Sequence, residues 1–175
     1  MRTSEFEAIV REHQAMVYSI AYNFFQDVSM AEEVAQDVFL QLYETGSTSP
    51  GTDTHIKRWL RKTTTHRSID VWRRRGRRPE VGLEQLPEIP SRSREQDPLM
   101  TQRLQRLVGA LPEKPRAVVI LRYGEDMDVH EIGEILEMPV ATVWSHLRRS
   151  IAILREKISE SVIEVHHERV RTQSS

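Results

Sequence analysis

A run of cationic side chains between residues 55 and 78 is the part of the sequence best suited to binding a polyanion. The segment carries ten basic and one acidic side chains, a net charge of +9. Lysine and arginine neutralise phosphates, while aromatic and hydroxyl groups stack on or hydrogen-bond unpaired bases. Trp59, Trp72, His66 and the run Thr63–Thr65 supply such groups. The segment indicates single-stranded nucleic-acid binding; the alternative is a solvated helix face with tryptophans in the core, which we favour for Trp59.

A second segment has the pattern of a helix-turn-helix. Asp128 and Glu131 have capping-box spacing at the start of a short helix, and Met138-Pro139 predicts a turn before a helix from Val140. The first turns of such a second helix enter the major groove of duplex DNA, where arginine, histidine, threonine and serine can donate to bases or phosphates. The outward positions of this helix are Ala141, Thr142, Trp144, Ser145, His146, Arg148 and Arg149.

The elements that must position these groups are all predicted to be helices. Apolar residues recur at three- and four-residue steps, and no strand-like alternation is found. The prediction is an all-α chain of two small helical domains joined by a flexible linker, the second containing the helix-turn-helix. We expect the first domain at 1–75, a proline-containing linker at 76–98, the second domain at 99–158 and a partly disordered extension at 159–175. At about 3.3 Å per residue, the linker could span on the order of 75 Å.

Composition excludes several classes of protein. The 175 residues include no cysteine, which rules out disulfides, thiolate zinc sites and cysteine nucleophiles. The seven histidines are scattered, and no HExxH, P-loop or paired-carboxylate pattern occurs, so we predict no enzyme, catalytic residue, metal, cofactor or small-molecule substrate. No apolar run reaches the length of a membrane span and no signal-peptide core is present, so we predict a cytoplasmic protein without membrane insertion.

The net charge of −1 is the sum of strongly opposed segments. Residues 1–50 carry two basic and eight acidic side chains, a net charge of −6. Residues 124–139 carry six acidic and no basic side chains, also −6. These acidic segments cancel the +9 segment, so the small total does not argue against nucleic-acid binding.

The order and spacing of several short motifs resemble the extracytoplasmic-function (ECF) group of the bacterial sigma-70 family. Val17–Ala21 followed by Ala31–Leu40 is similar to the family's polymerase-docking region, and Trp59–Lys62 with Asp70–Arg74 resembles its promoter −10 recognition helix. The family's −35-binding region is similar to four further segments of this chain: Leu111–Arg116, Leu121–Tyr123, Glu131–Gly133 and Pro139–Val143. The resemblance implies binding to core RNA polymerase, at the clamp helices of the largest subunit and the flap of the second largest. It also implies promoter DNA and an anti-sigma factor as partners.

The resemblance also implies three groups of site residues. The core-polymerase-binding group, with Phe39 expected as an exposed aromatic, comprises Glu33, Gln36, Asp37, Phe39 and Leu40. The −10-binding group comprises Arg61, Lys62, His66, Arg67, Arg73 and Arg74, and the loop at 46–53 falls where the family captures a flipped base. The −35-binding group comprises Thr142, Trp144, Ser145, His146, Arg148 and Arg149.

Three positions depart from the family's usual residues and leave the promoter sequence open. Many members carry asparagine in place of His66, lysine or arginine in place of Trp144, and arginine in place of His146.

Two other interpretations of the chain remain. A stand-alone helix-turn-helix regulator would leave the +9 segment without a role, and a sigma-like mimic that titrates an anti-sigma factor would not need DNA-facing cations.

Overall fold

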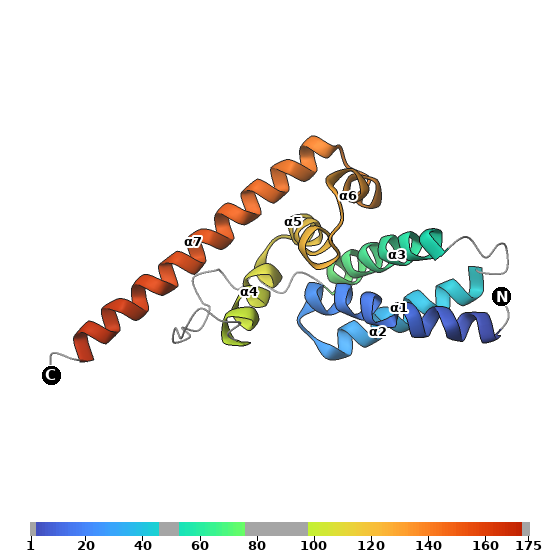
Figure 1. The fold of residues 1–175 in the computed structure, drawn as a ribbon, viewed down its shortest axis with the longest axis horizontal. Helices are drawn as coiled ribbons and strands as arrows, with labels where there is room; N and C mark the ends of the chain where they lie inside the picture. Colours follow the sequence, from blue (N-terminus) through green and yellow to red (C-terminus); the bar gives the residue numbers. More distant parts are fainter. Residues whose placement is uncertain (1–2, 46–52, 76–97, 173–175) are drawn as a thin grey trace.

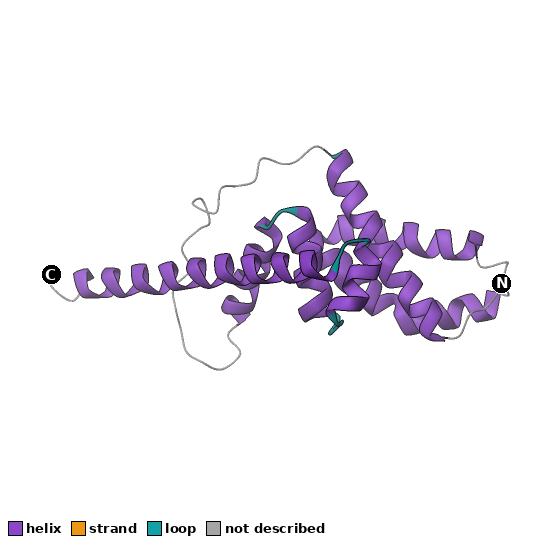
Figure 2. Ribbon diagram, turned by 90° about the horizontal axis from the view of Figure 1, so that it is seen from above, coloured by secondary structure: helices purple, strands orange, loops and turns teal. Residues whose placement is uncertain are grey.

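The computed structural model describes residues 3–45, 53–75 and 98–172. In the last of these ranges, the side chains of residues 100–159 are described. The described residues form two helical units (Figure 1, Figure 2). The first unit contains α1 (Thr3–Phe25), α2 (Val28–Thr45) and α3 (Asp53–Arg74). The second contains α4 (Pro98–Ala110), α5 (Glu113–Val119), the π-helical turn η2 (Ile120–Gly124), α6 (Val129–Leu136) and α7 (Val140–Thr172). No strand occurs among the described residues, and the predicted all-α fold is confirmed.

The first unit is held by apolar stripes on its three helices. Val17, Val34, Val38 and Leu60 are fully buried at its centre. Trp59 packs against this cluster half-buried, so the preferred interpretation of Trp59 as a core residue is confirmed. Helix α2 begins at Val28, and the Asp27 carboxylate before it accepts a hydrogen bond from the Met30 amide at 2.9 Å.

The second unit contains the predicted helix-turn-helix. The Asp128 carboxylate accepts from the amides of His130 and Glu131 at 2.8 and 2.9 Å, and the Glu131 carboxylate accepts from the Asp128 amide at 3.0 Å. This capping box starts α6, as predicted. Gly133 is required for the turn, since a Cβ there would lie 2.9 Å from the Met138 carbonyl oxygen.

Several expectations concern residues at the edges of the described ranges. The base-capturing loop, apart from Asp53 at the start of α3, and the linker, apart from Pro98 at the start of α4, lie outside the described residues. Helix α7 continues to Thr172 and projects away from the body of the molecule (Figure 1). The backbone over 159–172 belongs to this helix, which meets no glycine or proline after its start at Val140. The partial disorder expected for 159–175 stays a prediction.

The two units pack against each other, which the sequence did not predict. Ile20, Phe24 and Ile69 of the first unit share an apolar cluster with Ala117 and Ile120 of the second. All five are buried, so the two units form one continuous body in this structure. The contact brings α3 beside α5 and α6, as Figure 1 shows.

Candidate nucleic-acid interface

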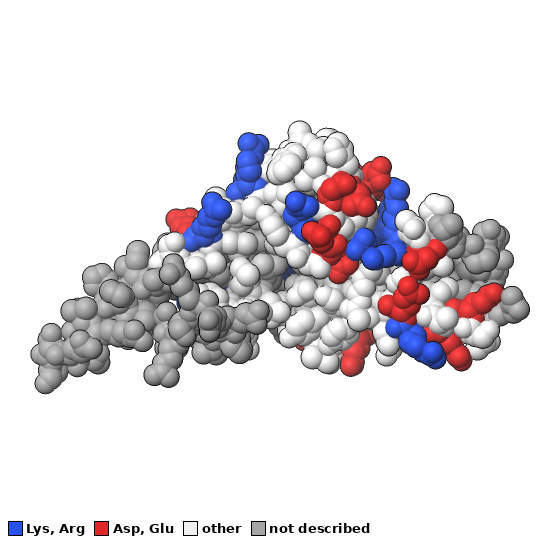
Figure 3. Space-filling view, viewed as in Figure 1, with Lys and Arg blue, Asp and Glu red and all other residues white. Residues whose placement is uncertain are grey.

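One face of α3 is turned toward the second unit, and its cations are paired there. Four ion pairs cross between the units: Arg58 with Glu134, Arg61 with Glu125, Lys62 with Glu137, and Arg73 with Glu113. Acidic and basic side chains lie interleaved over this junction in Figure 3. Three of the four cations belong to the predicted −10-binding group, so these residues contact acidic side chains of their own chain.

The centre of this junction is shielded from solvent. The side chains of Arg61 and Glu125 are 16% and 9% exposed, and their charged groups are 3.2 Å apart. Arg61 Nη2 also donates to the Glu125 backbone oxygen at 3.1 Å. Burial raises the pKa of the Glu125 carboxyl even though Arg61 opposes the shift. The pair is thus a partly desolvated contact that would be costly to break by removing one partner.

His66 and Lys62 extend the contact to the end of α6. His66 Nε2 lies 2.6 Å from the Ile135 carbonyl oxygen, one of the last carbonyls of that helix. Lys62 Nζ lies 2.8 Å from Glu137 Oε1. The hydrogen bond from Lys62, with the nearby positive charge, lowers the pKa of the Glu137 carboxyl. Glu137 itself has a left-handed backbone, with φ of 54°, which is uncommon for a residue with a long side chain.

Two threonines of α3, Thr64 and Thr65, are not available to nucleic acid. Thr64 and Thr65 are buried, and each hydroxyl donates to the carbonyl four residues earlier, at 2.6 and 2.8 Å. The suggested role of the Thr63–Thr65 run in binding bases is therefore wrong for these two residues. Trp72 is half-buried beside Phe24 and Phe25 at the contact between the units, so its ring is also partly covered.

The predicted polymerase-binding residues lie on α2, and two of them pair with α3. Asp37 accepts from Arg67 Nε at 2.9 Å and also from its Nη2, while Glu33 accepts from Arg75 Nη2 at 2.7 Å. The Asp37–Arg67 pair joins a residue predicted to bind polymerase to one predicted to bind the −10 strand. Gln36 is exposed on the same helix.

The expectation of an exposed aromatic at Phe39 is wrong. Phe39 is only 9% exposed and belongs to the core of the first unit, because α2 packs against its neighbours over a wider stripe than the sequence pattern indicated. The neighbouring Leu40 is 56% exposed, and Tyr43 is 48% exposed one turn further along. Leu40 and Tyr43, with the exposed Val28 at the start of the helix, are therefore the large apolar groups that α2 offers to a partner.

The predicted −35-binding residues lie on the first turns of α7. Trp144, Ser145, Arg148 and Arg149 are exposed, and Thr142 is partly exposed. Unlike the paired cations of α3, this part of α7 makes no ion pair with the described residues of the first unit. The helix-turn-helix thus presents its recognition helix to solvent, in the way a major groove requires.

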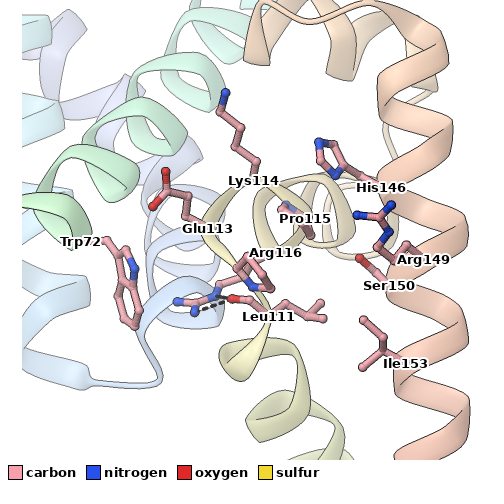
Figure 4. Close-up of a pocket in the computed structure, with 11 residues that line it drawn as sticks. Trp72, Leu111, Glu113, Lys114, Pro115, Arg116, His146, Arg149, Ser150 and Ile153 are labelled. Carbon is pink, nitrogen blue, oxygen red and sulfur yellow. Dashed lines mark hydrogen bonds between the residues drawn. The ribbon is translucent and has the colours of Figure 1, made fainter. Parts of the chain in front are cut away.

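His146 and Arg149 also line a pocket between α5 and α7, about 410 Å³ in volume, that extends to Trp72 (Figure 4). Burial is the largest cause of a lowered His146 pKa, and the positive charges of Arg149 and Lys114 lower it further. The lowered pKa favours the neutral form of the His146 imidazole. Lys114 is the cation that the sequence interpretation missed, since its proximity to α7 exists only in the folded unit.

One buried arginine connects the two units. Arg116 is 2% exposed; its Nη1 donates to the Phe24 carbonyl at 2.9 Å, and its Nε and Nη2 donate to the Leu111 carbonyl at 3.1 and 2.7 Å. Its guanidinium lies 4.2 Å from the centroid of the Trp72 ring. Arg116 appeared in the sequence only as the last residue of the Leu111–Arg116 motif, and its role in joining the units could not be derived from that motif.

Glu12, His13 and Asp53 are the group in the described residues that could hold a metal ion, since their ligand atoms lie within 4.8 Å of one another. His13 Nε2 is 3.2 Å from Asp53 Oδ1. Lys57 and Arg61 line the same pocket, and their positive charge opposes a cation. The arrangement is better explained as a hydrogen bond that links α1 to the start of α3.

The fold and these surfaces define a class: a helical protein with one basic helix and a helix-turn-helix whose second helix is exposed. Residues 9–78 match the family described as Sigma-70 region 2, and residues 101–154 match Sigma-70, region 4. The chain belongs to the sigma-70 family.

Curated relatives agree over most of the chain. It is 31% identical to the RNA polymerase sigma-E factor of Streptomyces coelicolor, covering 88% of this chain and 86% of the relative. It is 28% identical to the ECF RNA polymerase sigma factor SigW of Bacillus subtilis, covering 89% of each. The ECF RNA polymerase sigma factor SigE of Mycolicibacterium smegmatis is 31% identical over 88% of this chain, which spans 62% of that relative's length.

Two solved structures share the fold. The sigma factor RpoE from Bartonella quintana, solved with the anti-sigma factor NepR, matches with a TM-score of 0.67 and 18% identity, covering 90% of this chain and 98% of that one. CnrH, solved with the cytosolic domain of CnrY, matches with a TM-score of 0.66 and 19% identity, covering 91% and 90%. No helix in the described ranges is long and apolar enough to cross a membrane.

Proposed function

We propose that the chain is an ECF-type sigma factor that binds core RNA polymerase and directs promoter-specific initiation of transcription. The observation that carries the proposal is the presence of both sigma-70 regions, in order, on one chain of this length. It acts by binding and positioning, not by catalysis, and works in the cytoplasm where polymerase and DNA are. An anti-sigma factor is its expected regulator, as for the related sigma factors solved with such partners.

We assign the first unit, residues 1–75, to polymerase docking and −10 recognition. The docking surface is the exposed side of α2, where Glu33, Gln36 and Leu40 are accessible and Asp37 adds a carboxylate. An acidic surface with an exposed apolar residue suits a basic partner helix. Phe39 supports this surface from the core. The −10 strand would be bound by side chains of α3, namely those of Arg61, Lys62, His66, Arg67, Arg73 and Arg74.

We assign the second unit, residues 99–158, to the −35 duplex. The exposed Trp144, Ser145, Arg148 and Arg149, with Thr142 and His146, would contact the major groove and its phosphates. Lys114, which lines the same pocket as His146 and Arg149, would add a phosphate contact. Residues 79–102 carry five acidic and two basic side chains, a net charge of −3, which would disfavour DNA and suit a path through a basic polymerase channel. Replacing Glu80, Glu84 and Glu88 by lysine should impair transcription, and an unchanged rate would contradict that role.

The test of the function is in-vitro transcription with core polymerase and a library of promoters. The chain should direct initiation from a defined subset of sequences and should bind duplex promoter DNA weakly without polymerase. A stand-alone regulator would instead bind duplex tightly by itself and give no promoter-dependent initiation. The two DNA surfaces are separated by variants: Arg149→Ala should weaken −35 binding by about 1–3 kcal/mol, while His66→Ala should alter −10 preference and melting.

A further inference from the structure

The pocket between α5 and α7 has the size and the lining of a small-molecule site. Its volume of about 410 Å³ lies within the ~300–1,000 Å³ that is typical of such sites. The polar part of the lining includes Lys114, His146, Arg149 and Ser150. The apolar part comprises Trp72, Leu111, Pro112, Pro115 and Ile153. A recess with a cationic and an apolar part suits a ligand that carries both an anionic group and an organic group.

The buried hydroxyl of Ser150 points to a ligand in this pocket. Ser150 is 1% exposed, and its Oγ makes no hydrogen bond with any described residue. Buried hydroxyl groups are usually hydrogen-bonded, because an unpaired one loses its contacts with water without replacement. The Ser150 hydroxyl is directed from α7 toward α5, into the pocket, in Figure 4. An acceptor bound there would take the hydrogen bond that this hydroxyl can donate.

The side chains that α7 contributes to the pocket form a stripe of their own along the helix. They are His146, Arg149, Ser150 and Ile153. Because these positions are three and four residues apart, they lie on one side of α7, and this side faces α5 in Figure 4. Trp144 and Arg148 occupy other positions of the helix and are exposed. The pocket is therefore distinct from the outward face of the recognition helix, although Arg149 and His146 were also predicted to bind the −35 duplex.

Positive charge is in excess around the pocket. Lys114 and Arg149 make no ion pair with any described residue. Glu113 is the one acidic residue among the described residues of the lining, and its carboxylate accepts from Arg73 Nε at 2.8 Å. Burial, and then the positive charges of Arg149 and Lys114, lower the pKa of His146. An anion between these groups would offset the repulsion among them.

We propose that the pocket between α5 and α7 is a binding site for a small phosphate monoester. Arg149, Lys114 and Ser150 hold the phosphate, and the organic part of the ligand lies toward Trp72. A guanidinium can donate two parallel hydrogen bonds to phosphate oxygens, and a lysine adds a second positive charge. A monoester carries close to two negative charges at neutral pH, which matches two cations without acidic partners. The inference goes beyond the proposed function and does not depend on it.

The first experiment tests the role of Ser150. The probe is phenyl phosphate at about pH 7.5, and its affinity for the full chain is measured by isothermal titration calorimetry. Ser150→Ala removes only the hydroxyl, so we expect it to weaken binding about three- to tenfold. It should not lower the urea midpoint, because the hydroxyl has no partner in the protein and alanine favours a helix. Ser68→Ala is the matched control, since Ser68 is also buried with an unpaired Oγ but does not line the pocket.

The second experiment tests the role of the guanidinium. Arg149→Gln should weaken the binding of phenyl phosphate about tenfold, because it removes a charged donor of two hydrogen bonds. Arg106→Gln is the control, because Arg106 is an exposed arginine of α4 outside the pocket, and the net charge changes equally. We expect Arg106→Gln to leave the affinity within about twofold of the unaltered protein.

The third experiment identifies the anionic group that the pocket recognises. Methyl phenyl phosphate keeps the phosphate and the ring but is a diester with one negative charge, like a phosphate of the DNA backbone. Benzoate keeps the ring and replaces the phosphate by a carboxylate. Phenyl phosphate should bind at least about fivefold more tightly than either compound, because only the monoester places a second negative charge between Lys114 and Arg149.

The inference is overturned by any of three results. The first is that phenyl phosphate does not bind the unaltered chain. The second is that Ser150→Ala and Arg149→Gln bind it no more weakly than Ser68→Ala and Arg106→Gln, since the ligand would then lie elsewhere. The third is that methyl phenyl phosphate or benzoate binds as tightly as phenyl phosphate; the pocket would then serve as a contact for a duplex backbone or for an apolar group.

Discussion

Arg116 offers the sharpest test of how the two units are joined. Its guanidinium is buried, donates to the carbonyls of Phe24 and Leu111, and lies over the ring of Trp72. The Phe24 carbonyl is near the C-terminal end of α1, where a positive charge is favoured by the helix dipole. Methionine keeps an unbranched stem of similar length and removes every donor, so Arg116→Met isolates the contribution of the guanidinium.

The magnitude follows from the groups left behind. Hydrogen bonds from a charged donor contribute about 1.5–3 kcal/mol each, and a cation over an aromatic ring adds about 0.5–2 kcal/mol. Removing the guanidinium from water on folding costs several kcal/mol, and Arg116→Met removes this cost, so it offsets part of the lost hydrogen-bond energy. The bonds to Leu111 and Phe24 share one donor group, so their contributions do not add fully. We expect Arg116→Met to lower the free energy of unfolding by about 2–4 kcal/mol.

The assay is urea denaturation followed by circular dichroism. Spin labels on Gln14→Cys and Ala152→Cys, two exposed positions, report the distance between the units. Arg116→Lys should fall between the unaltered protein and Arg116→Met, since lysine keeps the charge without the forked donors. Arg106→Met is the control, because Arg106 is an exposed arginine of α4. An Arg116→Met variant within about 0.5 kcal/mol of the unaltered protein, with an unchanged label distance, would refute the reasoning.

Three further predictions concern individual positions. Gly133→Ala should destabilise the second unit by about 1–3 kcal/mol, because its Cβ would meet the Met138 carbonyl at 2.9 Å; an unchanged urea midpoint would show that the turn can relax. Phe39→Ala should cost about 3–5 kcal/mol of stability, whereas Leu40→Ala should leave the urea midpoint unchanged and weaken binding to core polymerase; equal effects of the two on stability would contradict the assignment of Phe39 to the core. Because the folded state lowers the pKa of His146, the unfolded state takes up its proton first, so stability should fall as pH drops through about 6.5. In urea titrations, His146→Gln should lose less stability between pH 7.5 and 5.5 than the unaltered protein. Identical losses in the two proteins would exclude the effect.

Local signals in the sequence predicted most of the fold. The capping box at Asp128 and the turn at Met138-Pro139 depend on neighbouring residues alone, so the helix-turn-helix could be located without tertiary information. The three- and four-residue spacing of apolar side chains predicted the cores of both units in the same way. Exact helix ends are less strongly determined, because several residues near a helix end can compete for the capping position; Asp27 takes it at the start of α2.

Candidate site residues were harder to predict, because exposure depends on neighbouring helices. Phe39 lies beside Val38 at the edge of the apolar stripe of α2, and only the packing of α1 and α3 decides that it is buried. Thr64 and Thr65 look like hydroxyls available to bases, yet both bond to the backbone of their own helix inside the core. The same tertiary contacts revealed Tyr43 and Lys114 as additional candidates.

The sequence by itself determined the helices, the two units, the helix-turn-helix and the large opposed charge segments, because each of these depends on residue type and short-range spacing. Tertiary structure decided which charges meet. The net charges of 55–78 and 124–139 can be counted from the chain, but a count contains no direction or distance. Only the packing of Phe24 and Ile69 against Ala117 and Ile120 brings Arg61 to Glu125, and it does so because burying apolar surface fixes the two helices at a separation that an ion pair can span.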